Sequence, residues 1–227
     1  KDSSIDVLSN KILTENNISS KFAIFSDLFA QNQKVAVLKA TDAVELEKLL
    51  ESYNGWLYSE YDDNMYDDYY SYLYINGNND DLEQSILDRF KLSIFIQKDY
   101  EILYDSGDLL WVGRGYPYRW LIFYKVPKSM TKHSPYNIFE NMINDYDLKT
   151  IDISDKNYYK KMNIGNDLEV FRGIYSNDET GGPFALYMLD NVRDDEVILV
   201  ASIINNPGKS KVPHLLQVDA LIRNAKF

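Results

Sequence analysis

The hydrophobic period of the chain changes near residue 91, and this change constrains the fold more than any other feature. Before it, apolar residues recur every three or four positions in segments such as 43–53 and 58–72, which is typical of helices. After it, apolar and polar residues alternate, most clearly over residues 118–126, which predicts strands with one buried face. The segment 197–204 is apolar on both faces apart from Ser202, so we expect a central strand covered on both sides.

The pattern predicts an order of elements. Helices are predicted at 5–31, 43–53, 56–74, 82–90, 134–147 and from 213 onward. Strands are predicted at 34–40, 91–97, 100–105, 108–114, 118–126, 168–176, 184–189 and 196–204. Expected helix caps are Ser20, Thr41 or Asp42, Asp80 or Asp81, and Ser134 followed by Pro135.

This order predicts an α+β fold in which helices flank an antiparallel β-sheet, an α-β-α sandwich-like arrangement with a helix-rich N-terminal third. We divide the chain into a helix-rich N-terminal part, 1–90, packed on an antiparallel-sheet part, 91–227. Because no Gly/Pro/Ser-rich linker separates them, we expect one compact unit.

Charge and composition exclude several classes. The net charge is −11, and residues 1–90 hold 7 basic and 17 acidic residues against 17 and 18 in residues 91–227. Neither part has the basic excess that nucleic-acid binding requires. The absence of cysteine excludes disulfides, thiolate catalysis and cysteine-ligated metals. No apolar run reaches the ~18 residues of a membrane span.

Catalytic patterns are also missing. The two histidines, His133 and His214, are not accompanied by a G-x-S-x-G motif, and the acidic segment 61–70 lacks the residue order of an EF-hand. We therefore expect no metal, no cofactor and no catalytic residue, and favour a non-enzymatic function. The 35 acidic residues still leave open a carboxylate-dependent hydrolase of envelope polysaccharide.

Two adjacent glycines, Gly181 and Gly182, stand before an apolar segment. A phosphate-binding loop would need a helix N-terminus after them, whereas Pro183 and strand-type residues follow. We predict instead a tight turn in which the glycines adopt positive φ and Pro183 stiffens the entry to the strand.

Aromatic and guanidinium side chains are interleaved over residues 111–120. Trp, Tyr and Arg are enriched at the centres of interfaces and at planar-ligand sites, so this segment is a candidate binding site. The alternative is that the tryptophans are core residues and the arginines are solvated. A mid-strand arginine at 172 is either exposed on the sheet or paired within it. The candidate ligand- or partner-binding residues are Trp111, Arg114, Tyr118, Arg119 and Arg172.

Four segments resemble a family of Bacteroidota lipoproteins known as domain of unknown function 4837. The resemblance is carried by 90–114, by "FRGIYSNDETGGPFALYML", by "NNPGKSKVPHLLQVDALI" and, near the front, by "FSDLFAQNQKVAVLKA". Asp99 stands where the family has glycine, and Asp219 where it has glutamate. The resemblance implies an exported, lipid-anchored cell-envelope protein, attached to the membrane through a cysteine upstream of Lys1, and it implies no activity.

These observations together favour a non-catalytic binding or assembly module. Its expected partner is a protein or glycan of the envelope, with no nucleic acid and with membrane contact only through the lipid anchor.

Overall fold

The computed structural model describes residues 10–12, 14–15, 19–31, 33–148, 151–164, 168–177, 180–190 and 196–226, with the backbone alone at 62–64. The chain divides into two units, Lys1–Asn64 and Met65–Phe227. The fold is α+β, as predicted, with a seven-stranded and a two-stranded antiparallel sheet plus helices. No helix in the described ranges is long and apolar enough to cross a membrane.

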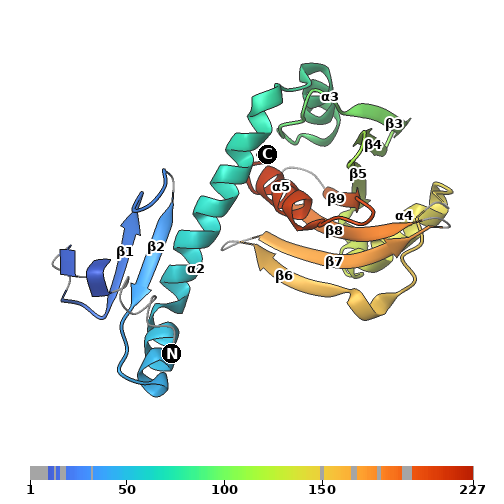
Figure 1. The fold of residues 1–227 in the computed structure, drawn as a ribbon. Helices are drawn as coiled ribbons and strands as arrows, with labels where there is room; N and C mark the ends of the chain where they lie inside the picture. Colours follow the sequence, from blue (N-terminus) through green and yellow to red (C-terminus); the bar gives the residue numbers. More distant parts are fainter. Residues whose placement is uncertain are drawn as a thin grey trace. The chain divides into compact units, whose positions relative to one another are not determined.

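The first unit contains a small hairpin and most of a long helix. Strands β1 (Phe22–Ser26) and β2 (Lys34–Leu38) pair antiparallel, and α2 (Ala43–Leu73) begins soon after them (Figure 1). Residues 65–73 of α2 belong to the second unit. Phe22 of β1 stacks on Tyr53 of α2 with ring centroids 4.3 Å apart. A small cluster around the buried side chains of Ile12 and Val37 forms the unit's core.

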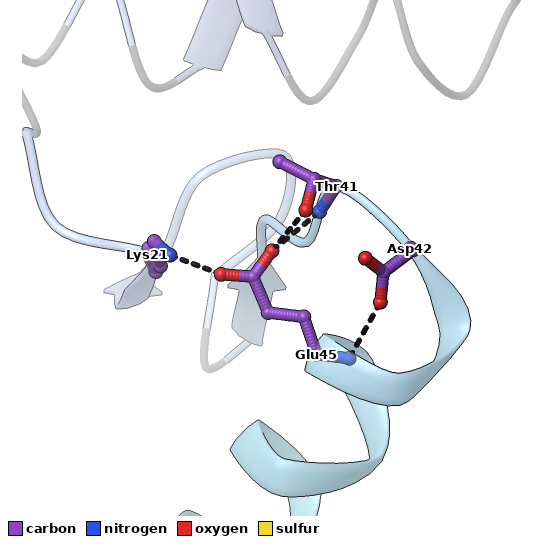
Figure 2. Close-up of polar contacts among 4 residues, drawn as sticks. All are labelled: Lys21, Thr41, Asp42 and Glu45. Atoms are coloured by element: carbon purple, nitrogen blue, oxygen red, sulfur yellow. Dashed lines mark hydrogen bonds and ion pairs between the residues drawn. The ribbon is translucent and has the colours of Figure 1, made fainter.

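The start of α2 is fixed by a capping network, shown in Figure 2. Asp42 is the cap residue, and its Oδ1 accepts a hydrogen bond from the backbone N–H of Glu45 at 2.8 Å. The Glu45 carboxylate in turn accepts from the backbone N–H and the hydroxyl of Thr41, at 2.6 and 2.7 Å, and pairs with Lys21. Since Lys21 directly precedes β1, the network joins the hairpin to the helix start.

The predicted helix at 5–31 is wrong where it overlaps β1. Phe22 and Phe25 fit a helical spacing, but here they lie on a strand, and the Ser20 hydroxyl bonds the carbonyl of Phe22 instead of capping a helix. Residues 10–12 and 14–15 are helical, and the rest of the predicted segment before residue 19 lies outside the described residues.

The second unit is built on one sheet of order β3-β4-β5-β9-β8-β7-β6, all antiparallel (Figure 1). The strands are β3 (Glu101–Ser106), β4 (Leu109–Arg114), β5 (Tyr118–Pro127), β6 (Lys160–Ile164), β7 (Leu168–Ser176), β8 (Gly181–Asp190) and β9 (Glu196–Asn205). The helices are α3 (Asp80–Phe90), α4 (Pro135–Asp145) and α5 (Val212–Arg223), with short 3-10 turns at Tyr74–Asn76, Lys128–Met130 and Lys156–Tyr158.

Alternation along the strands separates two hydrophobic cores. Leu121 and Phe123 of β5 face a core closed by α3, α5 and the last turns of α2. Ile122 and Val126 face the opposite side, where α4 packs. β9 is the central strand and is buried along almost its whole length, which confirms the prediction made from its two apolar faces.

The helix caps of the second unit follow the sequence closely. Ser134 caps α4 through its side chain, and Pro135 occupies the first turn, as predicted. The cap of α3 is Asn79, whose side chain accepts from the Leu82 N–H, instead of Asp80 or Asp81.

Two strand predictions fail in this unit. The segment 91–97 buries Leu92, Ile94 and Ile96 but joins no sheet and makes only isolated bridges, Ser93 to Lys226 and Gln97 to Asn78. The edge strand β6, at 160–164, was missed because four of its five side chains are exposed and its two apolar residues, Met162 and Ile164, are too few to establish a period of two.

The predicted positive-φ turn at Gly181–Gly182 is also wrong. Both glycines lie within β8, and the positive-φ glycines of the described chain are Gly77 and Gly208. The reason for glycine is close approach: a Cβ on Gly182 would lie 2.0 Å from the Ile204 carbonyl oxygen of β9. The connecting turn lies earlier, where Asn177 N–H bonds the Thr180 carbonyl at 2.8 Å.

Candidate functional site

The sheet divides the predicted binding residues between its two faces. Arg114, the last residue of β4, is the cross-strand partner of Arg119 on β5. Because side chains alternate along a strand, both arginines lie on the α5 face, together with Arg172 of β7. Trp111 and Tyr118 lie on the α4 face.

Arg119 is a buried cation without a carboxylate partner of its own among the described contacts. It is 7% exposed, and its Nη1 donates to the side-chain oxygen of Gln217 on α5 at 2.5 Å. Its Nε is buried and has no acceptor in the described structure. Burial, together with the positive charge of Arg114, lowers the pKa of the Arg119 guanidinium.

Arg114 holds the only carboxylate that pairs with these two arginines among the described residues. Its Nη1 donates to the Gln97 side chain at 2.7 Å, and its Nη2 pairs with Asp99, whose side chain is 51% exposed. The Arg114 Nε, like that of Arg119, is buried without an acceptor in the described structure. Two guanidinium groups therefore share one half-exposed carboxylate.

The N-terminal turns of α5 add no negative charge. Burial and the charges of Arg119 and Arg114 lower the pKa of His214, so this histidine is neutral at neutral pH. Its Nε2 lies 3.3 Å from the side-chain amide of Asn206, which is itself 5% exposed. Arg114 and Arg119 lie opposite each other on neighbouring strands, where like charges are destabilising. Since Asp99 is the one carboxylate that pairs with them among the described residues, this arginine pair (Arg114 and Arg119) keeps an uncompensated positive charge.

Arg172, in contrast, has a buried carboxylate partner, although its Nε, like those of Arg114 and Arg119, is buried without an acceptor in the described structure. It pairs with Asp219 of α5, which is completely buried. Asp219 also accepts a hydrogen bond from the Tyr187 hydroxyl at 2.6 Å and a longer one from Tyr66 at 3.4 Å. The guanidinium of Arg223 lies over the Tyr66 ring, 4.5 Å from its centroid.

The pKa shifts in this network follow from burial and pairing. Burial raises the pKa of Asp219, while the charge of Arg172 and the hydrogen bonds oppose that rise. Burial alone would lower the pKa of Arg172, but the Asp219 carboxylate raises it above the usual value. The pair connects α5 to β7, so among the described contacts Arg172 contributes to the packing of the helix on the sheet.

On the α4 face, four aromatic rings form a continuous row. Trp111 and Trp120 meet edge to face at 5.6 Å, Trp120 lies 6.3 Å from Tyr118, and Tyr118 lies 6.0 Å from Tyr116. The tryptophans are partly buried in the α4-side core, whereas Tyr116 and Tyr118 are exposed. Gly113 makes room for this row, because a Cβ there would lie 2.4 Å from the Trp120 ring.

Sequence reasoning missed the neutral partners of the arginines. Gln97 and Gln217 come from separate segments, and only the folded chain brings them to Arg114 and Arg119. His214, which contacts Asn206, is close enough for the charges of both arginines to lower its pKa. One signal was available: Asp219 interrupts the apolar stripe of the last helix, and a charge at such a position needs a buried partner. No cluster of three or more metal-ligating side chains occurs among the described residues.

The fold and the arginine pair define an α+β protein with a cationic, partly buried site between its sheet and its last helix. The chain belongs to the family described as domain of unknown function (DUF4837), whose model matches residues 79–224, more than half of the chain. This confirms the resemblance at the level of that family. No curated protein matches the chain. Several residues of the segments that carry the sequence resemblance lie on the α5 side of the sheet. They are Arg114, Arg172, Tyr187 and Gln217.

Proposed function

We propose that this chain is the ectodomain of an exported, lipid-anchored cell-envelope protein and acts as a non-catalytic module that binds an acidic glycan. The binding determinant is the arginine pair, and the ligand group is a carboxylate or phosphate on the glycan. The single observation that carries the proposal is that Arg119, 7% exposed, has only a neutral amide partner among the described residues while Arg114 lies directly opposite.

The arrangement favours an anionic ligand on energetic grounds. Burying charge without compensation is costly, and a bound anion would supply the missing charge and accept from the guanidinium N–H groups. Guanidinium groups recognise carboxylate and phosphate oxygens with paired, directional hydrogen bonds. Arg114 keeps 15% of its side chain exposed beside the half-exposed Asp99, so an incoming anion would compete with that carboxylate.

Exposed tyrosines at the turn between β4 and β5 support a glycan over an acidic peptide. Tyr116 and Tyr118 are 55% and 44% exposed, and they lie next to the arginines in the chain but on the α4 side of the sheet, so a glycan that contacts both groups would have to pass around this turn. Sugar rings present C–H faces that pack on aromatic rings, and amphipathic tyrosines suit such half-wet contacts. Arginine does not exchange protons near neutral pH, which supports binding without catalysis.

The binding test uses Arg119→Met and Arg114→Met in the full chain. We expect calorimetric titration with galacturonate oligomers or inorganic phosphate to give binding that each substitution weakens at least tenfold, roughly the loss of one charge-assisted hydrogen bond. The matched control is Lys156→Met, which removes an exposed cation 3.9 Å from Glu140 and should bind like the wild type. Neutral dextran should not bind at this site.

The same variants also test whether the charge of Arg119 is uncompensated in the free protein and which class of ligand binds. Without ligand, Arg119→Met should raise the melting temperature, because an uncompensated buried charge is replaced by an apolar side chain of similar length. Wild-type affinity in Arg119→Met would contradict the proposal. Binding of poly-glutamate but not of the acidic sugars would replace the glycan by an acidic protein partner.

Envelope anchoring is tested separately on the full-length gene product in its native cells. The motif resemblance to envelope lipoproteins supports this part of the proposal. We expect fatty-acid labelling and recovery in the membrane fraction, and recovery of an unlabelled product from the cytoplasm would contradict it.

A further inference from the structure

A separate hollow of about 520 Å³ lies in the second unit and shares no residue with the arginine pair. Its walls come from the end of α2 with the following 3-10 turn, from the first turns of α3, and from the segments joined by the Ser93–Lys226 bridge. The volume is that of a small-molecule site. The lining residues that matter are Tyr70, Tyr74, Asp80, Glu83, Phe95 and Asn224.

The aromatic wall is held rigidly. Tyr74 is 50% exposed, and its ring lies 4.2 Å from the Phe95 ring and 5.1 Å from the Tyr70 ring. The Tyr74 hydroxyl donates to the Tyr70 hydroxyl at 2.7 Å. Burial and that hydrogen bond raise the pKa of Tyr70, so its own O–H stays a donor. The hollow is thus lined by a fixed, half-exposed ring.

The polar wall is equally well positioned. The side-chain amide of Asn78 donates to Asp80 at 2.7 Å and to Glu83 at 3.1 Å. The other oxygen of Glu83 accepts from the Ile96 backbone N–H at 2.9 Å. Each carboxylate can accept about four hydrogen bonds, so both retain acceptor positions for a ligand.

The charge of the lining discriminates between ligand classes. Two carboxylates disfavour an anion, and Lys226, which also lines the hollow, disfavours a simple cation. The side chains of Gln84, Ser93 and Asn224 complete a lining that can both donate and accept. A ligand with many hydroxyl groups and an apolar ring face fits all of these groups at once.

We propose that this hollow is a binding site for a neutral saccharide, with Tyr74 packing on the sugar ring and Glu83 and Asp80 accepting from its hydroxyl groups. The site does not depend on the arginine pair and would stand if that pair bound nothing.

The test is saturation-transfer NMR on the full chain with cellobiose, maltose and N,N′-diacetylchitobiose as probes. We expect at least one to bind with a dissociation constant of about 1 mM or tighter. Tyr74→Ala, which removes a half-exposed ring, should weaken binding at least tenfold, and Glu83→Gln should weaken it measurably while keeping the shape of the side chain. A thermal melt of each variant verifies that it is folded.

Two control variants show whether the loss of disaccharide binding is specific to the hollow. Tyr158→Ala removes a similarly exposed tyrosine, 57% against 50%, outside the hollow and should leave disaccharide binding unchanged. Arg119→Met should also leave it unchanged, which separates this site from the acidic-glycan site. The inference is overturned if none of the three disaccharides binds, if folded Tyr74→Ala binds like the wild type, or if tetramethylammonium displaces the sugar and thereby identifies a cation site.

Discussion

At the residue scale, the two arginine environments on the α5 face differ in how charge is compensated. Arg172 has a dedicated buried carboxylate, Asp219, which is further held by Tyr187. Among the described residues, the hydrogen-bond acceptor of Arg119 is the neutral side-chain oxygen of Gln217. The first arrangement supplies a counter-charge within the fold, whereas the second leaves Arg119 without one among the described contacts, which is why we propose it as a binding determinant. Residue type and burial alone would not distinguish them.

The Arg172–Asp219 pair gives a stability prediction. Asp219→Asn leaves the guanidinium without its counter-charge, and breaking a buried pair costs about 3–5 kcal/mol. For a protein of this size we expect the melting temperature to fall by roughly 6–20 °C, at about 2–4 °C per kcal/mol. Calorimetry or a circular-dichroism melt measures this.

The matched control is Asp190→Asn, which breaks an exposed pair with Lys128 at 3.5 Å. An exposed ion pair contributes about 0–1 kcal/mol, so this melting temperature should hardly change. Equal melting temperatures for the two variants would show that Asp219 does not stabilise the sheet–helix contact.

At the element scale, the start of α2 depends on the ionisation of one side chain. Hydrogen bonds from Lys21 and Thr41 lower the pKa of Glu45 from 4.5 to about 2 (Figure 2). Because the folded pKa lies below the unfolded one, the stabilisation is present above pH 4.5 and is lost as the pH falls through about 2.

Carboxyl-carbon NMR should therefore show Glu45 titrating near pH 2, with the Thr41 amide resonance moving in the same step. Glu45→Gln should abolish that step, and Glu51→Gln, a change at an exposed position of the same helix, should keep it. A midpoint near 4.5 for Glu45 would mean that the capping network does not form in solution.

How well each element could be predicted depends on whether its pattern is local. The helix at 135–145 has its own cap and proline, and β9 has its own two-sided apolar run, so both were predictable. The strand at 22–26 is too short for its two phenylalanines to distinguish a helix from a strand. The edge strand β6 has only Met162 and Ile164 as alternating apolar residues, which is too short a pattern to indicate a strand.

The candidate sites were predictable only in part. The interleaved arginines and aromatics of 111–120 pointed to the right segment, and alternation already separated Tyr118 from Arg119. Two contacts could not be predicted from a local pattern because they join separate segments. These are the cross-strand pairing of Arg114 with Arg119 and the hydrogen bond from Arg119 to Gln217 of α5. The hollow at Tyr74 gave no sequence signal for the same reason.

At the scale of the whole molecule, the chain divides between Asn64 and Met65 into two compact units, and this division falls within α2. The last turns of α2 contribute to the main core: Leu73 is 2% exposed and Tyr66 is 5% exposed. The family match at 79–224 also lies within the second unit. That residues 1–90 and 91–227 form one compact unit stays a prediction.

We expect a fragment of residues 65–227 to fold alone with a cooperative melt. A fragment of residues 75–227 should melt about 10–20 °C lower, because it loses large buried side chains that are worth about 2–5 kcal/mol each. Circular dichroism and one-dimensional NMR compare the two. If both fragments melt alike, the last turns of α2 do not belong to the core.

The position of β9 has a consequence for the order in which the protein folds. This strand pairs with β5, some eighty residues earlier, and with β8, and the helix that covers it follows it. Pairings between distant segments form slowly, since the loop must close before the contacts stabilise it. A chain emerging from the ribosome therefore cannot close its sheet before β9 has been synthesised, and until then β5 and β8 lack the strand that lies between them.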